Sequence, residues 1–243
     1  MTGERAPLPE TFSAPPRGRA LALVPHADDD VIGCGGTCAL HARQGDPVRV
    51  IVIYSGVEGD PDRRYDPDEL AALRREEARS GGALLGLSDY EFWGYPEGHE
   101  PGLHELLVPV RRVAEAVRAF RPDVVYAPWV GEQHIDHHVA ARVVRMGLFL
   151  ARYAGAAFGF EVWTPLVATR IVDITLVYEQ KVAALREHKS QLAYRDILHM
   201  ALGFSSQRAM YLTRSLPDAR HGEAFAPLGE PFGRDRELLQ RNR

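Results

Sequence analysis

Short apolar segments alternate with helix-like segments along this chain, and this alternation restricts the fold more than any other feature of the sequence. Two of the apolar segments, Ala20 to Pro25 and Val48 to Tyr54, have the length and the flanking residues of buried strands. Between them, a Gly-rich stretch that runs into Ala39 and Leu40 predicts a helix, which the turn Gln44-Gly45-Asp46-Pro47 ends. The order is therefore strand, loop, helix, turn and strand.

The rest of the chain continues this pattern. Apolar residues at helical spacing predict helices over Glu69 to Leu85 and over about Leu106 to Phe120. Further strands are predicted at Tyr90 to Trp93, Asp123 to Pro128, Phe160 to Trp163 and Thr169 to Ile174. Alternating strands and helices predict an α/β, Rossmann-like fold with a mostly parallel sheet and helices on both faces. Ligands of such sheets bind outside the carboxyl ends of the strands.

The length and composition fit one domain. A chain of 243 residues, of which 45% are hydrophobic, can bury one substantial core. We expect this domain over residues 20–230, after a loose arm at 1–19 and before a charged tail at 231–243. The charged end from Arg234 to Arg243 fits either a short surface helix or a frayed tail. The loop from Glu58 to Asp68 follows a strand, so we expect it at the functional edge of the sheet.

Charge and hydropathy argue against several classes of protein. The net charge of -4 comes from 33 acidic and 29 basic residues that are spread along the chain, without the basic stripe that nucleic acid requires. No segment approaches the ~20 consecutive apolar residues of a membrane span, and the N-terminus lacks the apolar run of a signal peptide. Cys34 and Cys38 do not have zinc-knuckle or disulfide spacing. We therefore expect a soluble, cytoplasmic protein that binds neither nucleic acid nor membranes.

The first strand leads into a cluster of possible metal ligands, Pro25-His26-Ala27-Asp28-Asp29-Asp30. A strand-to-helix turn with an imidazole and three carboxylates is typical of a metal site at an active-site edge. The alternative is a helix N-cap, because Asp favours that position and complements the helix dipole. One Asp suffices for a cap, so three exceed that need. His26 by itself is more typical of a structural histidine.

A second cluster, His134-Ile135-Asp136-His137-His138, follows the strand that ends at Pro128. The spacing of His134 and His137 puts two side chains on one face of a helix. A solvated helix start explains one of these histidines easily and both less well. Because both clusters follow strands of one parallel sheet, we expect them to converge at the same edge. A catalytic zinc takes three ligands of the His and Asp type and leaves one position for water, and the chain offers such a set.

The paired motifs His26-Ala27-Asp28-Asp29 and His134-Ile135-Asp136-His137 resemble the N-acetylglucosaminyl deacetylase family, also called the LmbE-like or PIG-L family. The resemblance extends from about Ala20 to Phe225. It implies a metal-dependent N-deacetylase that hydrolyses the amide of an N-acetylated, or similarly acylated, amino sugar or amino-sugar conjugate. It also implies a zinc cofactor, with Fe²⁺ as the alternative metal. The sequence leaves open whether the chain forms a homo-oligomer.

Residue roles follow from the resemblance by position. It implies that His26, Asp29 and His137 bind zinc, that Asp28 is the general base, and that His134 is the charged or proton-donating partner.

Three further positions carry less specific implications. Arg74, in Leu73-Arg74-Arg75-Glu76-Glu77-Ala78, matches an arginine that contacts substrate, and its alternative is a surface helix charge. Glu97 stands where the family usually has an Asp that binds sugar hydroxyls. His221 stands where related members carry a Tyr that donates a hydrogen bond to the oxyanion, and its alternative is a surface histidine beside a Gly turn.

The remaining motif residues are given structural interpretations. Asp136 either holds His134 in one tautomer or caps a helix. Asp30 replaces a more usual Glu and has no direct chemical role. Lys189-Ser190-Gln191 matches a family feature and is interpreted as structural.

Rival functions remain open at this point. An amidase acting on a larger acyl group or a thiol-conjugate amide would use the same zinc site. A sugar-binding protein that retains the metal without turnover would not need Asp28 and His134. A phospho-receiver pocket at Asp28 to Asp30 would not explain the histidine motif. Gly33-Cys34-Gly35-Gly36 lacks the spacing of a dinucleotide fingerprint, so its glycines more readily serve close packing of a helix on the sheet.

Overall fold

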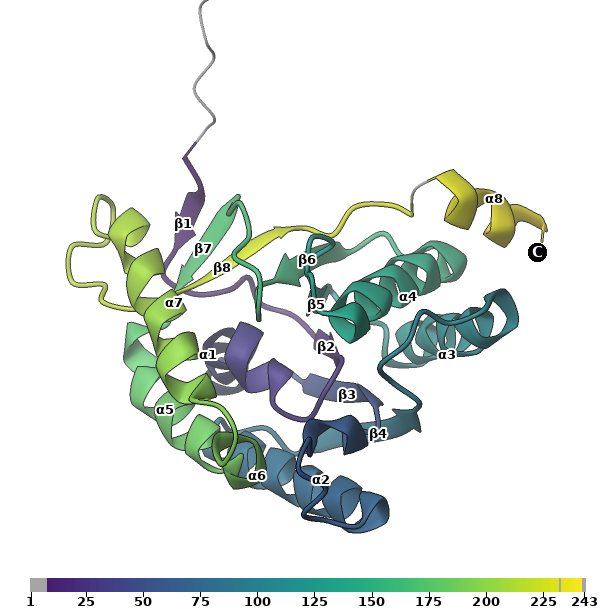
Figure 1. Ribbon diagram of the computed structural model, residues 1–243. Coiled ribbons are helices and arrows are strands. Elements are labelled where there is room, and N and C mark those ends of the chain that lie inside the picture. Colours follow the sequence, from purple (N-terminus) through teal and green to yellow (C-terminus); the bar gives the residue numbers. More distant parts are fainter. Residues whose placement is uncertain (1–7, 232, 242–243) are drawn as a thin grey trace, which may run out of the picture.

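The computed structural model describes residues 8–231 and 233–241 of the chain. Its strands are β1 (Glu10–Phe12), β2 (Ala20–Val24), β3 (Val48–Tyr54), β4 (Asp89–Tyr95), β5 (Val124–Pro128), β6 (Ala156–Phe160), β7 (Arg170–Asp173) and β8 (Gly222–Pro227). They form an eight-stranded sheet in the order β1-β7-β8-β6-β5-β2-β3-β4 (Figure 1). Strand β8 is antiparallel to β6 and β7, and the other neighbouring strands are parallel. The predicted mostly parallel sheet is therefore confirmed.

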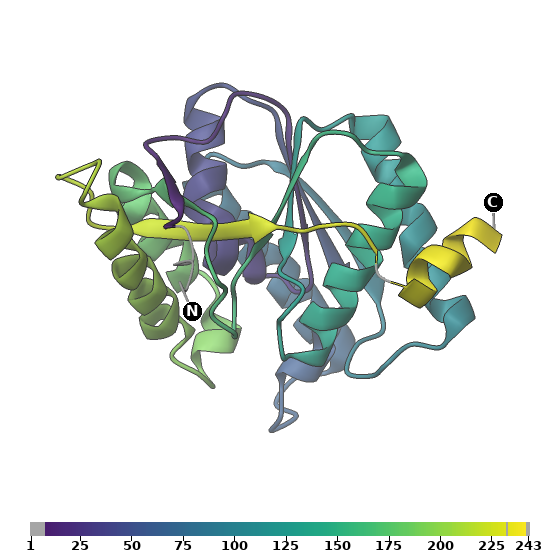
Figure 2. The ribbon, with the colours of Figure 1, turned by 90° about the horizontal axis from the view of Figure 1, so that it is seen from above.

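Helices cover both faces of this sheet (Figure 2). They are α1 (Asp29–Arg43), α2 (Pro67–Leu84), α3 (Leu103–Phe120), α4 (Ile135–Ala151), α5 (Tyr178–Arg186), α6 (Lys189–Leu192), α7 (Ile197–Leu212) and α8 (Gly233–Arg241), with short 3₁₀ helices η1 (Val57–Gly59) and η2 (Thr175–Val177). Within the described ranges, none of the helices has both the length and the apolar composition that a bilayer span needs.

Side chains of the central strands alternate between two hydrophobic cores. In β2, Ala20, Ala22 and Val24 pack with residues of α1, α2, α5 and α7. Leu21 and Leu23 point to the opposite face and pack with α3 and α4. This alternation follows from the two-residue period of a strand, and burial on both faces explains why β2 is apolar throughout.

Helix α1 lies unusually close to the sheet at its glycines. A Cβ atom added to Gly33 would lie 2.1 Å from a ring carbon of Phe160, at the end of β6. No side chain fits at that distance, so the glycine is needed for packing. The interpretation of the Gly-rich segment as a packing feature is confirmed.

A buried ion pair fixes the course of α1 beyond its first turns. The helix changes direction at Cys34, where the backbone leaves helical geometry. The two carboxylate oxygens of Glu223 accept hydrogen bonds from the backbone N–H groups of Gly36 at 2.8 Å and Thr37 at 2.7 Å. The Lys181 ammonium lies 2.7 Å from the same carboxylate. Strand β8 and helix α5 therefore hold α1 together.

Helix α2 begins as its sequence indicates. The Asp66 side chain accepts a hydrogen bond of 2.9 Å from the backbone N–H of Asp68, and Pro67 occupies the first turn. Arg74 and Glu77, nearly one turn apart, are both buried on the same face of this helix. The helix therefore directs both charged side chains into the protein interior.

The two ends differ in part from the sequence-based expectations. Residues 10–12 belong to the predicted loose arm but form β1, which pairs in parallel with β7, so that prediction is wrong there. The cause is the edge of β7, whose backbone groups gain partners from β1. Of the two alternatives for the charged C-terminal end, the structure has the helix α8, whose Asp235 bonds Arg142 of α4 at 2.7 Å. Residues 1–7, 232 and 242–243 lie outside the described residues.

One strand boundary also differs. The strand predicted over Phe160 to Trp163 already ends at Phe160. Beyond it, the backbone N–H groups of Val162, Trp163 and Thr164 donate to the carboxylate of Glu132 instead of to a neighbouring strand.

Candidate active site

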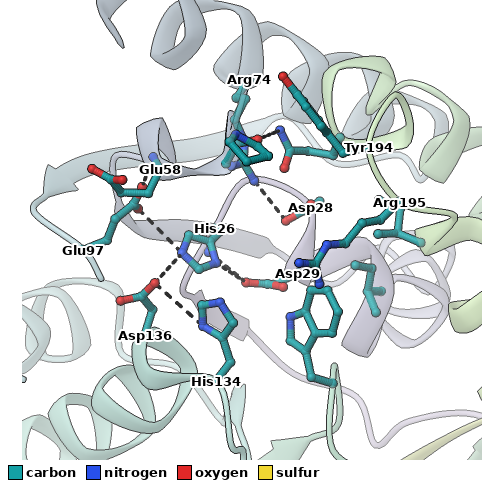
Figure 3. Close-up of a pocket in the computed structure, with 16 residues that line it drawn as sticks. His26, Asp28, Asp29, Glu58, Arg74, Glu97, His134, Asp136, Tyr194 and Arg195 are labelled. Atoms are coloured by element: carbon teal, nitrogen blue, oxygen red, sulfur yellow. Dashed lines mark hydrogen bonds and ion pairs between the residues drawn. The ribbon is translucent and has the colours of Figure 1, made fainter. Parts of the chain in front are cut away.

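The two ligand clusters meet at the carboxyl edge of the sheet. Strand β2 ends at Val24 and leads through His26 into α1, whereas β5 ends at Pro128 and leads to His134 and α4. Because β2 and β5 are neighbouring parallel strands, both turns lie at the same edge. A cavity of about 260 Å³ opens there (Figure 3). The predicted convergence is confirmed, and Glu58, Gly59 and Pro61 of the loop after β3 also line this cavity, as the sequence indicated.

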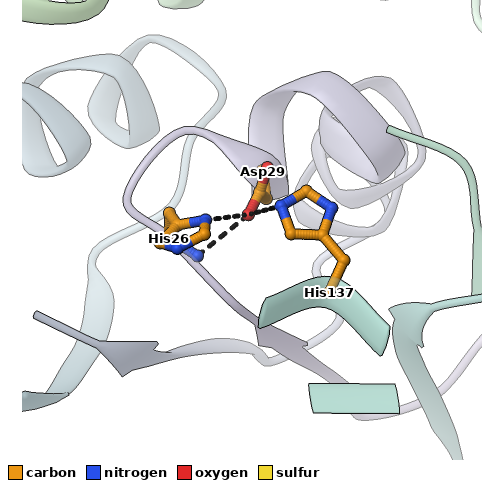
Figure 4. Close-up of side chains that lie close together, drawn as sticks. All are labelled: His26, Asp29 and His137. Carbon is orange, nitrogen blue, oxygen red and sulfur yellow. Dashed lines mark hydrogen bonds and ion pairs between the residues drawn. The ribbon is translucent and has the colours of Figure 1, made fainter. Parts of the chain in front are cut away.

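His26, Asp29 and His137 surround one point (Figure 4). One ligand atom from each lies within 4.8 Å of the others. Oδ2 of Asp29 lies 3.3 Å from Nδ1 of His26 and 3.3 Å from Nε2 of His137. The structure thus brings together the three residues that the family resemblance implies as zinc ligands.

The chemistry of these donors fits a zinc ion. Both ring nitrogens of the buried His137 lack a hydrogen-bond partner within the described ranges, which is costly unless another group satisfies them. Oε2 of Glu132 lies 3.7 Å from Nδ1 of His137, and a carboxylate near the second nitrogen is typical of metal-binding histidines. Two imidazoles and one carboxylate beside an open cavity match the ligands of a catalytic zinc.

Electrostatics keep the aspartate of this cluster ionised. Burial by itself would raise the pKa of Asp29, but the adjacent His137 and His26 outweigh burial and hold this pKa well below its usual range. Burial likewise opposes the charged form of His26, whereas Asp136 and Asp29 raise the pKa of His26 to about 10. A metal ion bound here would therefore displace a proton from His26.

Asp28 is available for chemistry because it does not cap its helix. It occupies the N-cap position of α1, yet its side chain makes no capping hydrogen bond. Its carboxylate lines the cavity and accepts a hydrogen bond of 3.3 Å from Nη2 of Arg74. The cap alternative is therefore wrong for this side chain.

Arg74 is a buried contact of Asp28 and not a surface charge. It is 4% exposed, and its Nη1 donates to the carbonyl of Gly56 at 2.8 Å. Its guanidinium joins Asp28 to the loop after β3, so the surface-charge alternative is wrong. A direct contact with substrate stays a prediction for Arg74.

The Lys189-Ser190-Gln191 segment holds α2 in place, which confirms its structural interpretation. Ser190 donates from its backbone N–H at 2.7 Å and from its hydroxyl at 2.6 Å to the two carboxylate oxygens of Glu77. Gln191 lines the cavity and donates to the carbonyl of Gly59 at 3.4 Å.

Glu97 reaches the cavity from the segment after β4. Its two carboxylate oxygens accept backbone hydrogen bonds of 2.8 Å from Gly56 and from Glu58, and one of them lies 3.6 Å from Nε2 of His26. The side chain thus fixes the loop after β3. Its binding of sugar hydroxyls stays a prediction.

Asp136 contacts His26 more closely than it contacts His134. Its Oδ2 lies 3.3 Å from Nε2 of His26 and 3.7 Å from Nδ1 of His134. Its Oδ1 accepts a hydrogen bond of 2.6 Å from the backbone N–H of Gly98. Asp136 therefore links both histidines to the loop that carries Glu97.

His134 stands at the N-cap position of α4 and faces the cavity. Burial, followed by the nearby His137 and His26, lowers the pKa of His134 below its usual value. This shift favours the neutral imidazole near pH 7, a form that donates a hydrogen bond without carrying charge.

His221 does not join this site. Its ring stacks on Tyr178 with the centroids 3.3 Å apart, and it is not among the residues that line the cavity. It precedes β8, which β6 and β5 separate from β2 in the sheet. The expectation that His221 bonds the oxyanion therefore finds no support, and we remove this residue from the candidate site.

Several lining residues were not singled out from the sequence, among them Trp163, Tyr194 and Arg195. Trp163 could have been found, because it ends a predicted strand at the edge where both metal motifs lie. Tyr194 and Arg195 come from the segment between α6 and α7, for which the sequence carried no recognised motif.

This fold and this ligand cluster define an α/β enzyme with a candidate metal centre at the carboxyl edge of its sheet. Residues 21–147 match the model of the PIG-L family, which is described as GlcNAc-PI de-N-acetylase. This match covers more than half of the chain, so the chain belongs to the PIG-L family. The resemblance in the sequence and the expectation of an enzyme from this amide-hydrolase family are confirmed.

Individual relatives agree with this assignment. A diacetylchitobiose deacetylase of Thermococcus kodakarensis is 27% identical over 194 residues, which cover 71% of this chain and 70% of that protein. A 2'-N-acetylparomamine deacetylase of Streptomyces fradiae is 30% identical over 206 residues, which cover 72% of this chain and 74% of that protein. Both are N-deacetylases, which hydrolyse amide bonds.

A solved structure confirms the fold alone. GalB, the 4-carboxy-2-hydroxymuconate hydratase of Pseudomonas putida KT2440, has a TM-score of 0.75 and 21% identity to this chain. The similarity covers 88% of this chain and 98% of GalB. The fold therefore also occurs in an enzyme with a different reaction, and the reaction of this chain has to be argued from its site.

Proposed function

We propose that this chain is a zinc-dependent N-deacetylase that removes an acetyl or similar acyl group from an amino sugar or an amino-sugar conjugate. The observation that carries this proposal is the His26, Asp29 and His137 cluster, of which His26 and Asp29 line the same cavity as Asp28. The acetylated amino sugars named for two relatives support the substrate class.

The cluster would hold the metal ion through its two imidazoles and its carboxylate, with Fe²⁺ as the alternative to zinc. A bound zinc ion supplies a Lewis acid that lowers the pKa of water to about 7 and polarises a carbonyl group. The cavity beside the cluster is large enough for an acetyl group and part of a sugar ring. The proton transfers of the reaction fall to the side chains that line this cavity.

Asp28 is the base in this scheme. Its carboxylate takes a proton from the attacking water, and the 3.3 Å contact with Arg74 holds that carboxylate toward the cavity. His134, on the facing loop, donates a hydrogen bond to the developing oxyanion as a neutral imidazole. The proton that Asp28 gained then passes to the leaving nitrogen and the carbon–nitrogen bond breaks, so that an amine and a carboxylic acid leave the site.

The test is a substrate panel with the zinc-loaded protein. We expect N-acetylglucosamine, diacetylchitobiose or an N-acetylglucosaminyl inositol to release primary amine and acetate in equal amounts. Amine release from longer N-acyl sugars alone would point to an amidase for larger acyl groups. If no N-acyl sugar in the panel released amine, the deacetylase proposal would be wrong.

A further inference from the structure

We infer that Arg195 recognises an anionic group, a phosphate or a carboxylate, on the amino-sugar part of the substrate. This inference rests on the proposed function and narrows its substrate class to acidic amino sugars. Three observations carry it. Arg195 lies at the cavity, the Trp163 ring that it contacts is held in place by hydrogen bonds, and no described carboxylate neutralises its charge.

Arg195 is placed beside the reaction site by an aromatic side chain. Its guanidinium carbon lies 5.0 Å from the ring centroid of Trp163. The Trp163 ring in turn stacks with His134, with centroids 6.1 Å apart and planes at 18°. A cation on an aromatic face is held in place by attraction to the ring, so Trp163 sets the distance between Arg195 and His134.

The segment that carries Trp163 is held in place by hydrogen bonds. The buried carboxylate of Glu132 accepts the backbone N–H groups of Val162 at 2.7 Å, Trp163 at 3.2 Å and Thr164 at 3.3 Å. The indole N–H of Trp129 donates to the Thr164 carbonyl at 2.8 Å. A partly exposed tryptophan in a segment that this many hydrogen bonds hold in place is preorganised, which is typical of a binding surface.

The charge of Arg195 is not neutralised by the protein. Across residues 8–231 and 233–241, its side chain has neither an ion pair nor a hydrogen bond to a carboxylate, whereas Arg74, the other arginine of the cavity, bonds Asp28 and Gly56. The adjacent Asp196 instead accepts the backbone N–H of His199 at 2.9 Å and caps α7. Arg195 therefore retains all its donors, which match the oxygens of a phosphate or a carboxylate.

The charges across the cavity give the substrate one orientation. Glu58 and Glu97 lie on one side of His26, and Arg195 lies on the other side (Figure 3). Glu58 and Glu97 repel an anionic group, whereas Arg195 attracts it. Arg195 is exposed, whereas Asp29 and His137 of the metal cluster are buried and His26 is half-buried, so the acyl group belongs at the cluster and the sugar reaches Arg195.

The experiment compares matched substrates of the zinc-loaded protein: N-acetylglucosamine, its 1-phosphate, its 6-phosphate, its uronic acid and N-succinylglucosamine. We expect at least one acidic sugar to have a kcat/KM about 10- to 100-fold above that of neutral N-acetylglucosamine. Arg195→Gln should leave the zinc content unchanged and should lower the kcat/KM of the acidic sugar about 10- to 100-fold more than that of the neutral sugar, so that the preference is lost. Arg195→Lys should restore part of it. The phosphate and uronate arms identify the source of the anion.

Arg214→Gln is the matched control, since it removes the same charge from an exposed arginine just beyond the other end of α7. Equal kcat/KM values for acidic and neutral sugars, or a preference that survives Arg195→Gln, would overturn the inference and leave the deacetylase proposal intact. A preference for the N-succinyl substrate alone would also overturn it, because the anion would then lie on the acyl side. If no substrate released amine, the deacetylase proposal would fail. Calorimetry would then compare glucosamine with its 1-phosphate, its 6-phosphate and its uronic acid, and equal affinities for all four would overturn the role of Arg195.

Discussion

Asp28 and Asp29 are neighbours in sequence but make different contacts, and this difference can be tested. Asp29 touches both histidines of the cluster, whereas Asp28 touches Arg74. We expect Asp28→Asn to retain zinc and to lose turnover by about 10²- to 10⁴-fold, because it removes the base and leaves the cluster unchanged. Metal analysis and turnover on the same sample measure both. Asp62→Asn, in the exposed loop, is the control, and near-native turnover of Asp28→Asn would require another base.

The adjacent histidines of α4 provide a second test. His137 is fully buried in the cluster, whereas His138 is exposed. We expect His137→Ala to lose the metal and His138→Ala to keep about one ion per chain, because three donors are needed to hold a catalytic zinc. Elemental analysis after dialysis decides between them. Full occupancy in His137→Ala would remove this residue from the ligand set.

Single residues of the site were predictable to different degrees. The convergence of the two motifs was predictable, because parallel strands bring their carboxyl ends to one edge. The choice of His26, Asp29 and His137 within these motifs came from the family resemblance. The burial of Arg74 was not predictable, since a helix face does not show what packs against it. Arg195 was missed for a related reason, because its role depends on a contact with Trp163 that no local pattern contains.

At the scale of secondary structure, the buried contact between α1, α5 and β8 makes a strong prediction. Glu223→Gln leaves the Lys181 ammonium buried, at 1% exposure, without a carboxylate. We expect the free energy of unfolding to fall by about 3–5 kcal/mol, as is typical when one partner of a buried ion pair is removed. Denaturant unfolding with zinc present measures this change.

The control for this variant is Glu10→Gln on β1, whose carboxylate lies 3.7 Å from Arg170 in an exposed pair. That variant should change the free energy of unfolding by no more than about 1 kcal/mol. A loss in Glu223→Gln as small as in Glu10→Gln would mean that α1 does not depend on the ion pair.

Strand β8, which carries Glu223, also shows where the prediction of secondary structure failed. Strand β8 was missed because it begins with Gly222 and the buried Glu223, which leave only a short apolar run before Pro227. The helices from α5 to α7 were also not predicted, since their buried positions include charged side chains such as Lys181 and Arg208. By contrast, β2 and the buried part of β3 from Val50 to Tyr54 were clear, because burial on both faces requires apolar residues.

At the scale of the whole molecule, the two edges of the sheet have separate tasks. The carboxyl edge holds the cluster and the cavity. At the opposite edge, the segment before β2 is fastened to the turn before β3, where Arg17 donates to Asp46 at 2.8 Å. Nδ1 of His41 is hydrogen-bonded to the same carboxylate at 3.0 Å, and its Nε2 is hydrogen-bonded to the Tyr126 hydroxyl at 3.1 Å. Stability can therefore be changed at this edge without a change in the chemistry of the other.

The carboxylate of Asp46 makes this separation testable through pH. Burial by itself would raise the pKa of Asp46, but hydrogen bonds from His41 and Arg17 hold it below its usual value. A lowered folded-state pKa contributes stability above the unfolded-state pKa of about 4 and loses it as the pH falls through the folded-state value. We expect Asp46→Asn to lower Tm by a few degrees at pH 7 and by progressively less below about pH 4. Calorimetry at several pH values measures the difference, and kcat at pH 7 should match the parent. A Tm difference that stayed constant down to pH 3 would show that the charge of Asp46 is not what stabilises this edge.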